Sequence, residues 1–210
     1  MTEALTVGVV PGVSADKWAR IWHERLPEVP LLVVQLPEDE AGPALLHRVD
    51  MVFARLPVPD EADLHVIPLW DEVPVVVAAK DHPIRVFDSV TLAELADEEL
   101  HPGVDEATLD LVAAGHGIAQ MPQSVYRAAG RRDLVAREIS DAPRTRIALV
   151  WPRRRTGPLI DEFVGIVRGR TANSSRGGGA PPEPSKPAAP LPGRAGRPVR
   201  KASVRRKGRR

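Results

Sequence analysis

The residues best suited to chemistry in this chain are the cations of its last forty positions. Residues 171–210 hold eleven Lys or Arg side chains and one acid, Glu183, a net charge of +10. Cations at this density neutralise phosphates without reading sequence, and the segment has no aromatic side chain to stack on a base. The sequence therefore predicts DNA or RNA binding by the cations nearest the end: Arg194, Arg197, Arg200, Lys201, Arg205, Arg206, Lys207, Arg209 and Arg210. A solubilising tail is the alternative.

A second candidate site is the turn Pro11–Ser14, which follows an apolar run and precedes a helical pattern. The N-terminus of a helix offers free N–H groups and a partial positive charge, which suit a carboxylate or phosphate. We therefore predict that Gly12, Val13 and Ser14 contact a small-molecule ligand. The alternative is that Ser14 only caps the helix, a role that stabilises a helix by about 1 kcal/mol.

Other familiar chemistries have no support in the sequence. There is no Cys, so disulfides and thiolate chemistry are excluded, and none of the six His forms an HxxxH spacing. The run Gly12–Asp16 lacks the second Gly of a nucleophile elbow, and Gly115–Gly117 fits the end of a helix better than a nucleotide-binding loop. We predict no catalytic residue, no metal and no cofactor, and hence a protein that is not an enzyme.

The charges divide the chain sharply. Residues 1–120 have a net charge of −15 and residues 121–170 one of +6. Much of the positive charge of residues 121–170 lies in two loop clusters, Arg131–Arg132 and Arg153–Arg155. These clusters are either ordinary solvated loop charge or an extension of the basic surface of the tail.

The elements that must position these residues alternate between strands and helices. Strands are predicted at 5–10, 31–36, 49–56, on either side of Pro74 within 65–81, and at 117–122, 134–139 and 145–152; helices are predicted at 14–26, 43–48, 91–96, 105–114, 124–129 and 158–168. Short strands separated by crossover helices predict an α/β fold with a partly parallel sheet.

The last forty residues differ in composition from the rest. They contain seven Pro and six Gly and few large aliphatic residues, too little apolar surface to offset the entropy of ordering. We expect a folded domain at 1–170 and a disordered basic tail at 171–210. The chain has no secretory signal and no apolar run long enough to span a bilayer, so we predict a cytoplasmic, nucleoid-associated protein with no membrane contact.

Several strings, in order, resemble the effector-binding (substrate-binding) domain of LysR-type transcriptional regulators. They are LTVGVVPG, VDMVFARLPV, IPLWDEVPVVVAAKDHP, LAELADEEL, LVAAGHGIAQMPQSV and RIALVWPRR followed by LIDEFVGIVR. The resemblance covers about residues 5–169. It implies a type 2 periplasmic-binding-protein fold, in which a ligand cleft lies between two α/β lobes and the Pro11–Ser14 turn contacts the effector.

Two departures from this family shape the expected function. Met1 stands four residues before the first strand, so we expect the usual DNA-binding helix-turn-helix to be absent. Only HPGVDEATLD separates LADEEL from LVAAGHG, so we expect a reduced second lobe. Asp105 and Glu106 would begin a helix across the cleft and repel an anionic ligand.

These observations favour a transcription- or nucleoid-associated protein in which a LysR-like sensor or interaction domain carries a basic, nucleic-acid-binding tail. One alternative is a cytoplasmic small-molecule binding module. Another is a protein-interaction module, forming a homodimer or pairing with a LysR-type regulator through its first helix and edge strand.

Overall fold

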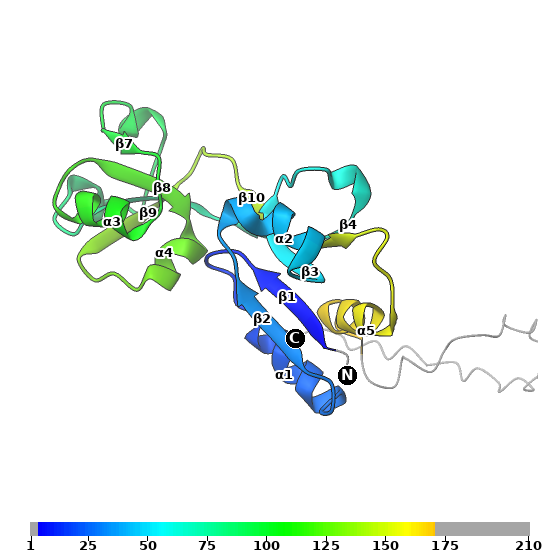
Figure 1. Cartoon of the computed structure of the whole chain (residues 1–210). Helices are drawn as coiled ribbons and strands as arrows, with labels where there is room; N and C mark the ends of the chain where they lie inside the picture. The colour runs from blue at the N-terminus through cyan, green and yellow to red at the C-terminus, as the bar shows by residue number, and fades with distance from the viewer. Residues whose placement is uncertain (1–3, 171–210) are drawn as a thin grey trace, which may run out of the picture. The chain divides into compact units, whose positions relative to one another are not determined.

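The computed structural model describes residues 4–170, which form two α/β lobes joined by two crossing segments (Figure 1). The first lobe comprises residues 4–72 and 145–170, and the second comprises residues 73–144. The chain crosses from β4 to β5 around Val73 and returns between β9 and β10. This is the type 2 periplasmic-binding-protein architecture that the sequence predicted. The cationic residues of 171–210 lie outside the described residues.

The first lobe is built on a five-stranded sheet in the order β2-β1-β3-β10-β4. Its strands are β1 (Leu5–Val9), β2 (Leu31–Gln35), β3 (Met51–Leu56), β4 (Leu64–Glu72) and β10 (Thr145–Pro152). Strand β1 runs parallel to β2 and β3, whereas β10 runs antiparallel to β3 and β4. The sheet is therefore parallel where crossover helices connect its strands, and antiparallel where the chain returns from the second lobe.

Three α-helices belong to this lobe: α1 (Asp16–Arg25), α2 (Ala41–His47) and α5 (Pro158–Val167); short 3-10 helices lie at Glu38–Glu40 and Glu61–Asp63. An aromatic cluster joins α1 and α5 to the sheet. The ring of Phe53 stacks on Trp18 at 4.7 Å between centroids and meets Phe163 edge-on at 6.1 Å. Trp22 and Phe163 have no exposed surface. The lobe thus has one large core, and this core holds the end of β1 and the start of α1 in place.

The second lobe has its own five-stranded sheet, in the order β6-β9-β5-β8-β7. Its strands are β5 (Pro74–Ala79), β6 (Ser89–Val90), β7 (Leu100–His101), β8 (Ile118–Pro122) and β9 (Leu134–Ile139). The central strand β5 is buried on both faces: Val75 and Val77 pack on one side and Val76 and Ala78 on the other. Its continuous apolar run is what a strand covered on both faces requires.

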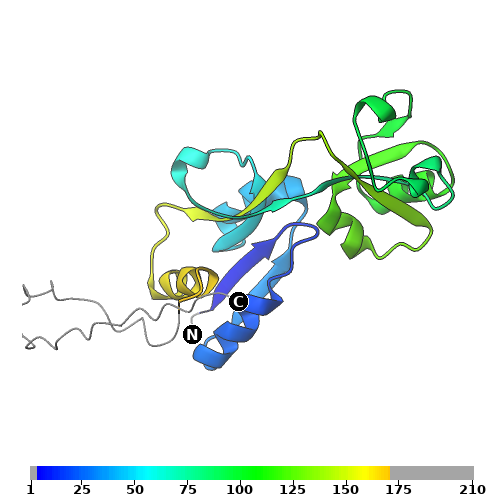
Figure 2. The ribbon, with the colours of Figure 1, turned by 180° about the vertical axis from the view of Figure 1, so that it is seen from behind.

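Helices flank the sheet of the second lobe, and the reduction expected for this lobe stays a prediction. Across residues 73–144, all of which are described, its α-helices are α3 (Glu106–Ala113) and α4 (Gln123–Ala129), and 3-10 helices lie at Pro83–Val86 and Ala93–Leu95. Figure 2 gives the reverse view, in which the two crossing segments run between the lobes.

Some predicted boundaries were wrong. Helix α1 ends at Arg25 rather than at Leu26, α2 begins at Ala41 rather than at Pro43, and β3 begins at Met51 rather than at Val49. Residues 91–96 contain only the 3-10 turn Ala93–Leu95. In the last case the segment is too short to offset the cost of nucleating an α-helix.

Candidate functional site

The Pro11–Ser14 turn lies where β1 leaves the sheet of the first lobe. The N–H of Val10 donates to the carbonyl of Phe53 at 3.2 Å, and the N–H of Val13 donates back to the carbonyl of Val10 at 3.1 Å. Gly12 has a φ of +81°, in the left-handed region that glycine adopts without strain. The turn is therefore a closed loop directed away from the sheet and toward the second lobe.

The N-cap residue of α1 is Ala15, so the alternative in which Ser14 takes that position was wrong. Ala15 offers no side-chain hydrogen bond. Ser14 instead accepts a hydrogen bond from the N–H of Asp16 at 3.2 Å, and its hydroxyl donates to the carboxylate of Asp16 at 2.8 Å. Because Ser14 is exposed, its hydroxyl also remains within reach of a ligand.

Helix α4 of the second lobe packs closely against this turn. A Cβ atom added to Gly12 would lie 2.7 Å from the hydroxyl of Ser124 and 2.7 Å from the backbone nitrogen of Val125. Any side chain at Gly12 would therefore collide with the backbone of the first turn of α4. Glycine is required here both for its φ angle and for the close approach of the two lobes.

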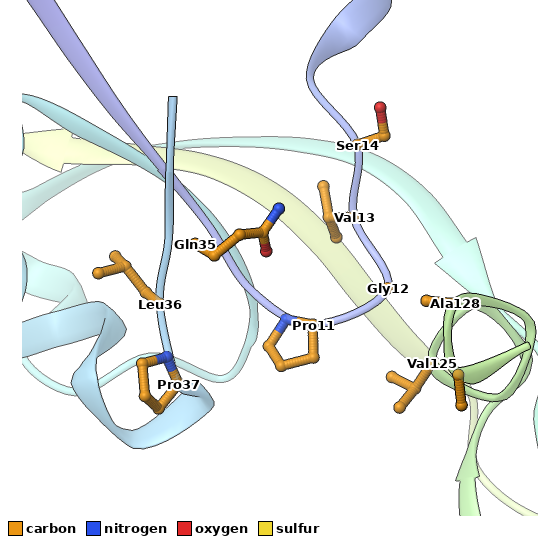
Figure 3. Close-up of a pocket in the computed structure, with 10 residues that line it drawn as sticks. Pro11, Gly12, Val13, Ser14, Gln35, Leu36, Pro37, Val125 and Ala128 are labelled. Carbon is orange, nitrogen blue, oxygen red and sulfur yellow. The ribbon is translucent and has the colours of Figure 1, made fainter. Parts of the chain in front are cut away.

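A cavity of about 660 Å³ opens beside this contact (Figure 3). The turn lies between the end of β2 on one side and α4 on the other. The lining residues are Pro11, Gly12, Val13, Ser14, Gln35, Leu36, Pro37, Val125, Ala128 and Ala129. The volume is that of a typical small-molecule site, and the lining is apolar apart from two uncharged polar side chains.

Gly12, Val13 and Ser14 all line the cavity, and they are the three residues that the sequence predicts for ligand contact.

The expected role of α3 was wrong. Asp105 caps α3 by accepting from the N–H of Thr108 at 2.8 Å, and neither Asp105 nor Glu106 is part of the lining. Helix α4 takes the position across the cleft, because it directly follows β8, the strand next to the crossing strand β5.

A buried ion pair adjoins the turn, and sequence reasoning missed it. Arg55, on β3, donates from Nε to Glu72 at 2.5 Å and from Nη2 at 3.1 Å, and it also pairs with Glu38. Its Nη2 donates to the carbonyl of Pro11 at 3.2 Å as well. The side chains of Arg55 and Glu72 are 8% and 2% exposed. One guanidinium thus joins the cavity turn to the last residue of β4.

The two carboxylates on Arg55 differ in pKa. Burial acts to raise the pKa of Glu72, but hydrogen bonds from Arg55, Ser124 and Thr145 together outweigh it and hold the pKa below its ordinary value. Burial also raises the pKa of Glu38, assisted by the charge of Glu72, and the attraction of Arg55 does not fully compensate. The pKa of Glu72 is thus lowered and that of Glu38 is raised, although both side chains pair with the same guanidinium.

The loop cations lie outside the cavity. Arg131 forms ion pairs with Asp110 at 2.8 Å and with Asp133 at 2.7 Å, and these contacts raise its pKa. Arg153 donates to the carbonyl of Ala62 at 2.9 Å, and Arg155 pairs with Asp50. Three of these cations therefore hold loops of the body in place.

The remaining motifs have structural roles. As predicted, α3 ends in the Gly115–Gly117 turn, where the N–H of His116 donates to the carbonyl of Leu111 at 3.0 Å. Within residues 4–170 no group of three or more His, Asp or Glu side chains is arranged to hold a metal ion. In the same part of the chain, no helix is both long and apolar enough to cross a membrane.

The family model for the LysR substrate binding domain matches residues 2–101 and 105–172. The chain belongs to this family. No curated protein matches it in sequence. As a LysR substrate-binding domain, it is an effector-sensing domain of the kind used in transcription regulation, and the type 2 periplasmic-binding-protein fold is that of its family.

Solved structures give the same fold. The BenM effector-binding domain with its effector benzoate is 19% identical, with a TM-score of 0.66 over 86% of this chain and 96% of that one. The reduced form of the OxyR regulatory domain from Pseudomonas aeruginosa is 21% identical, with a TM-score of 0.62 over 80% and 95%. Full-length CbnR in complex with its target DNA is 17% identical, with a TM-score of 0.65 over 80% and 70%.

Proposed function

We propose that this chain is a non-enzymatic regulator that binds a small-molecule effector between its lobes and nucleic acid through its basic C-terminal segment. The observation that carries the first part is the cavity bounded by the Pro11–Ser14 turn and α4. Its walls come from both lobes, so a ligand there contacts both and changes the free energy of one lobe arrangement relative to another. The family match adds support, since effector sensing belongs to this family.

In this proposal the contacts to the effector come from the turn and from the end of β2. Gly12 and Val13 present backbone and apolar surface, and Ser14 offers a hydroxyl. Gln35 adds an amide that can donate and accept. Ala128 and Ala129 form the opposite wall with their small side chains, which leaves the space open.

A cavity-filling variant tests the site. Ala128 is exposed and lines the cavity, so Ala128→Trp fills the space without disturbing the core. Ala107, an exposed residue of α3, gives the matched control Ala107→Trp. We expect small molecules that raise the melting temperature of the native chain to act equally on Ala107→Trp and to lose their effect on Ala128→Trp. Equal responses from both variants would exclude the cavity as the site.

The second part of the proposal rests on charge. Residues 171–210 carry a net charge of +10, and one strand of duplex DNA offers a phosphate every 3.4 Å or so. The nine cations from Arg194 to Arg210 would bind phosphates without distinguishing sequences. The protein would therefore act in the cytoplasm, associated with the nucleoid, with DNA or RNA as its partner.

Deletion of residues 171–210 tests this part by gel shift on duplex DNA and on RNA. We expect the intact chain to bind with a slope of log K against log salt approaching −0.9 for each phosphate neutralised, up to about ten phosphates. The 1–170 chain should lose most of this affinity. Equal binding by the two chains would show that the tail does not hold nucleic acid.

A protein-interaction role is a second candidate, favoured by one edge of the first lobe. Strand β2 is an edge strand, and its Leu32 and Val33 are 51% and 41% exposed. An exposed apolar edge can pair with a second copy or with a LysR-type regulator. If so, Leu32→Lys should dissociate an assembly measured by light scattering, while circular dichroism shows that the fold of the chain is unchanged. An unchanged mass would remove this candidate.

A further inference from the structure

Glu72 is a buried carboxylate in an uncommon position, the last residue of β4, where the chain leaves the first lobe. Its exposed fraction is 4%. Burying a carboxylate away from water costs free energy unless donors form hydrogen bonds to its oxygens. Four such bonds are present, so Glu72 is fully satisfied.

The four donors come from both lobes. One oxygen of Glu72 accepts from Nη2 of Arg55 and from the hydroxyl of Ser124, and the other accepts from Nε of Arg55 and, at 3.1 Å, from the hydroxyl of Thr145. Arg55 lies on β3 of the first lobe, Ser124 on α4 of the second, and Thr145 at the start of the returning strand β10. A single carboxylate therefore joins both lobes and both crossing segments.

This donor set is one that a bound carboxylate ligand would need. A guanidinium presents two parallel N–H groups, and two hydroxyls complete the shell. In this chain the carboxylate is part of the protein. Arg55 is also paired with the half-exposed Glu38, so its single positive charge is shared between two acids of the same chain.

The adjoining cavity is left without a positive charge. Among its described lining residues none is charged, and its polar side chains are Ser14 and Gln35. No cation lines the cavity for an anion to pair with, and the nearby Arg55 is already paired with two carboxylates. An uncharged, mostly apolar molecule needs no such partner.

We infer that Glu72 is a built-in carboxylate ligand of an anion site between the lobes, and that it restricts the adjoining cavity to uncharged, mainly apolar ligands. The first half of this inference stands on the Glu72 contacts alone. The second half rests on the proposed function of the cavity.

The test is chemical rescue of Glu72→Ala in the full chain. The substitution removes the atoms beyond Cβ, which correspond to one acetate ion, and leaves Arg55, Ser124 and Thr145 around the space. We expect the melting temperature to fall by roughly 6–20 °C, the shift of a broken buried ion pair in a domain of this size. Acetate should then raise the melting temperature saturably, and at ten times its Kd it should lower the unfolding equilibrium constant by about tenfold.

Controls separate this effect from general salt stabilisation. Chloride at equal ionic strength and neutral acetamide should not rescue Glu72→Ala, and acetate should not raise the melting temperature of the native chain. Glu72→Gln, which fills the space, should be destabilised without rescue. Glu162→Ala breaks the ion pair with Arg25 elsewhere, measured at 2.8 Å, and should also show no saturable rescue.

Three results overturn the anion site. The Glu72→Ala variant is as stable as the native chain, or acetate stabilises it no more than chloride does, or it stays unfolded in both salts. A variant that folds only with acetate supports the anion site.

The ligand class is tested by titrating the native chain with benzamide and benzoate, which share a ring and differ in charge. Binding of benzamide with at least tenfold weaker binding of benzoate supports the inference. Equal binding of the two overturns it. If acetate rescues Glu72→Ala and neither aromatic compound binds the native chain, the anion site holds and the proposed cavity function fails.

Discussion

A methyl group added at Gly12 should push the two lobes apart. Gly12→Ala forces a left-handed backbone on a residue with a Cβ, which costs about 1–2 kcal/mol. The new Cβ would also lie 2.7 Å from the backbone nitrogen of Val125, and backbone cannot move aside as the end of a flexible side chain can. Relieving such overpacking costs roughly another 1–3 kcal/mol.

The structure supplies a matched control in Gly115. Its φ is +86°, close to the +81° of Gly12, but a Cβ added there meets no atom within 4 Å. Gly115→Ala therefore has the backbone cost without the collision. The difference between the two variants isolates the contact between the lobes, at roughly 1–3 kcal/mol or about 2–12 °C in melting temperature.

Differential scanning fluorimetry and urea unfolding of the two variants measure this difference. Gly12→Ala should unfold at the lower temperature and at the lower urea concentration. If Gly12→Ala is no less stable than Gly115→Ala, the turn does not pack against α4 as described, and the cavity loses one of its walls.

Two further predictions concern the cores and the buried carboxylate. Phe163→Ala should cost about 3–5 kcal/mol, because the ring has no exposed surface, whereas Phe87→Ala, at a ring 49% exposed, should change stability by no more than about 0.5 kcal/mol in urea unfolding. The pKa of Glu72 lies below its ordinary value, so its ionised form stabilises the fold above the unfolded pKa of about 4.3, and this contribution is lost as the pH falls through the folded pKa. The gap in melting temperature between the native chain and Glu72→Gln should therefore be widest above pH 5 and narrow on acidification; a gap that is constant from pH 7 to pH 3.5 would contradict this assignment.

Much of the fold could be predicted because its strands have clear local patterns. The apolar run from Val75 to Ala79 predicts a central strand, and Pro74 marks its start and so separates it from strand β4. The Pro11–Ser14 turn could be predicted as well, since a Pro-Gly pair between a strand and a helix has few structural alternatives. The least accurate predictions were helix starts, where Ala15 rather than Ser14 occupies the cap.

The cavity wall and the ion pair could not be predicted in the same way. Glu72, Arg55 and Ser124 lie far apart in the sequence, and each looks like an ordinary polar residue at the end of an element. Only the crossing of two strands between the lobes brings them together. Local patterns carry no information on such non-local contacts. For the same reason the sequence favours α3, with its two acids at the start, as the cleft helix, whereas the structure has α4 in that position.

An NMR titration of the isotope-labelled chain with benzamide shows whether a ligand binds between the lobes. We predict chemical-shift changes at the amides of Gly12–Ser14 and of Val125–Ala129, their loss in Ala128→Trp, and their persistence in Ala107→Trp. Shifts that map away from the turn and α4, or that persist unchanged in Ala128→Trp, would contradict the claim that the cavity between the lobes is the ligand site.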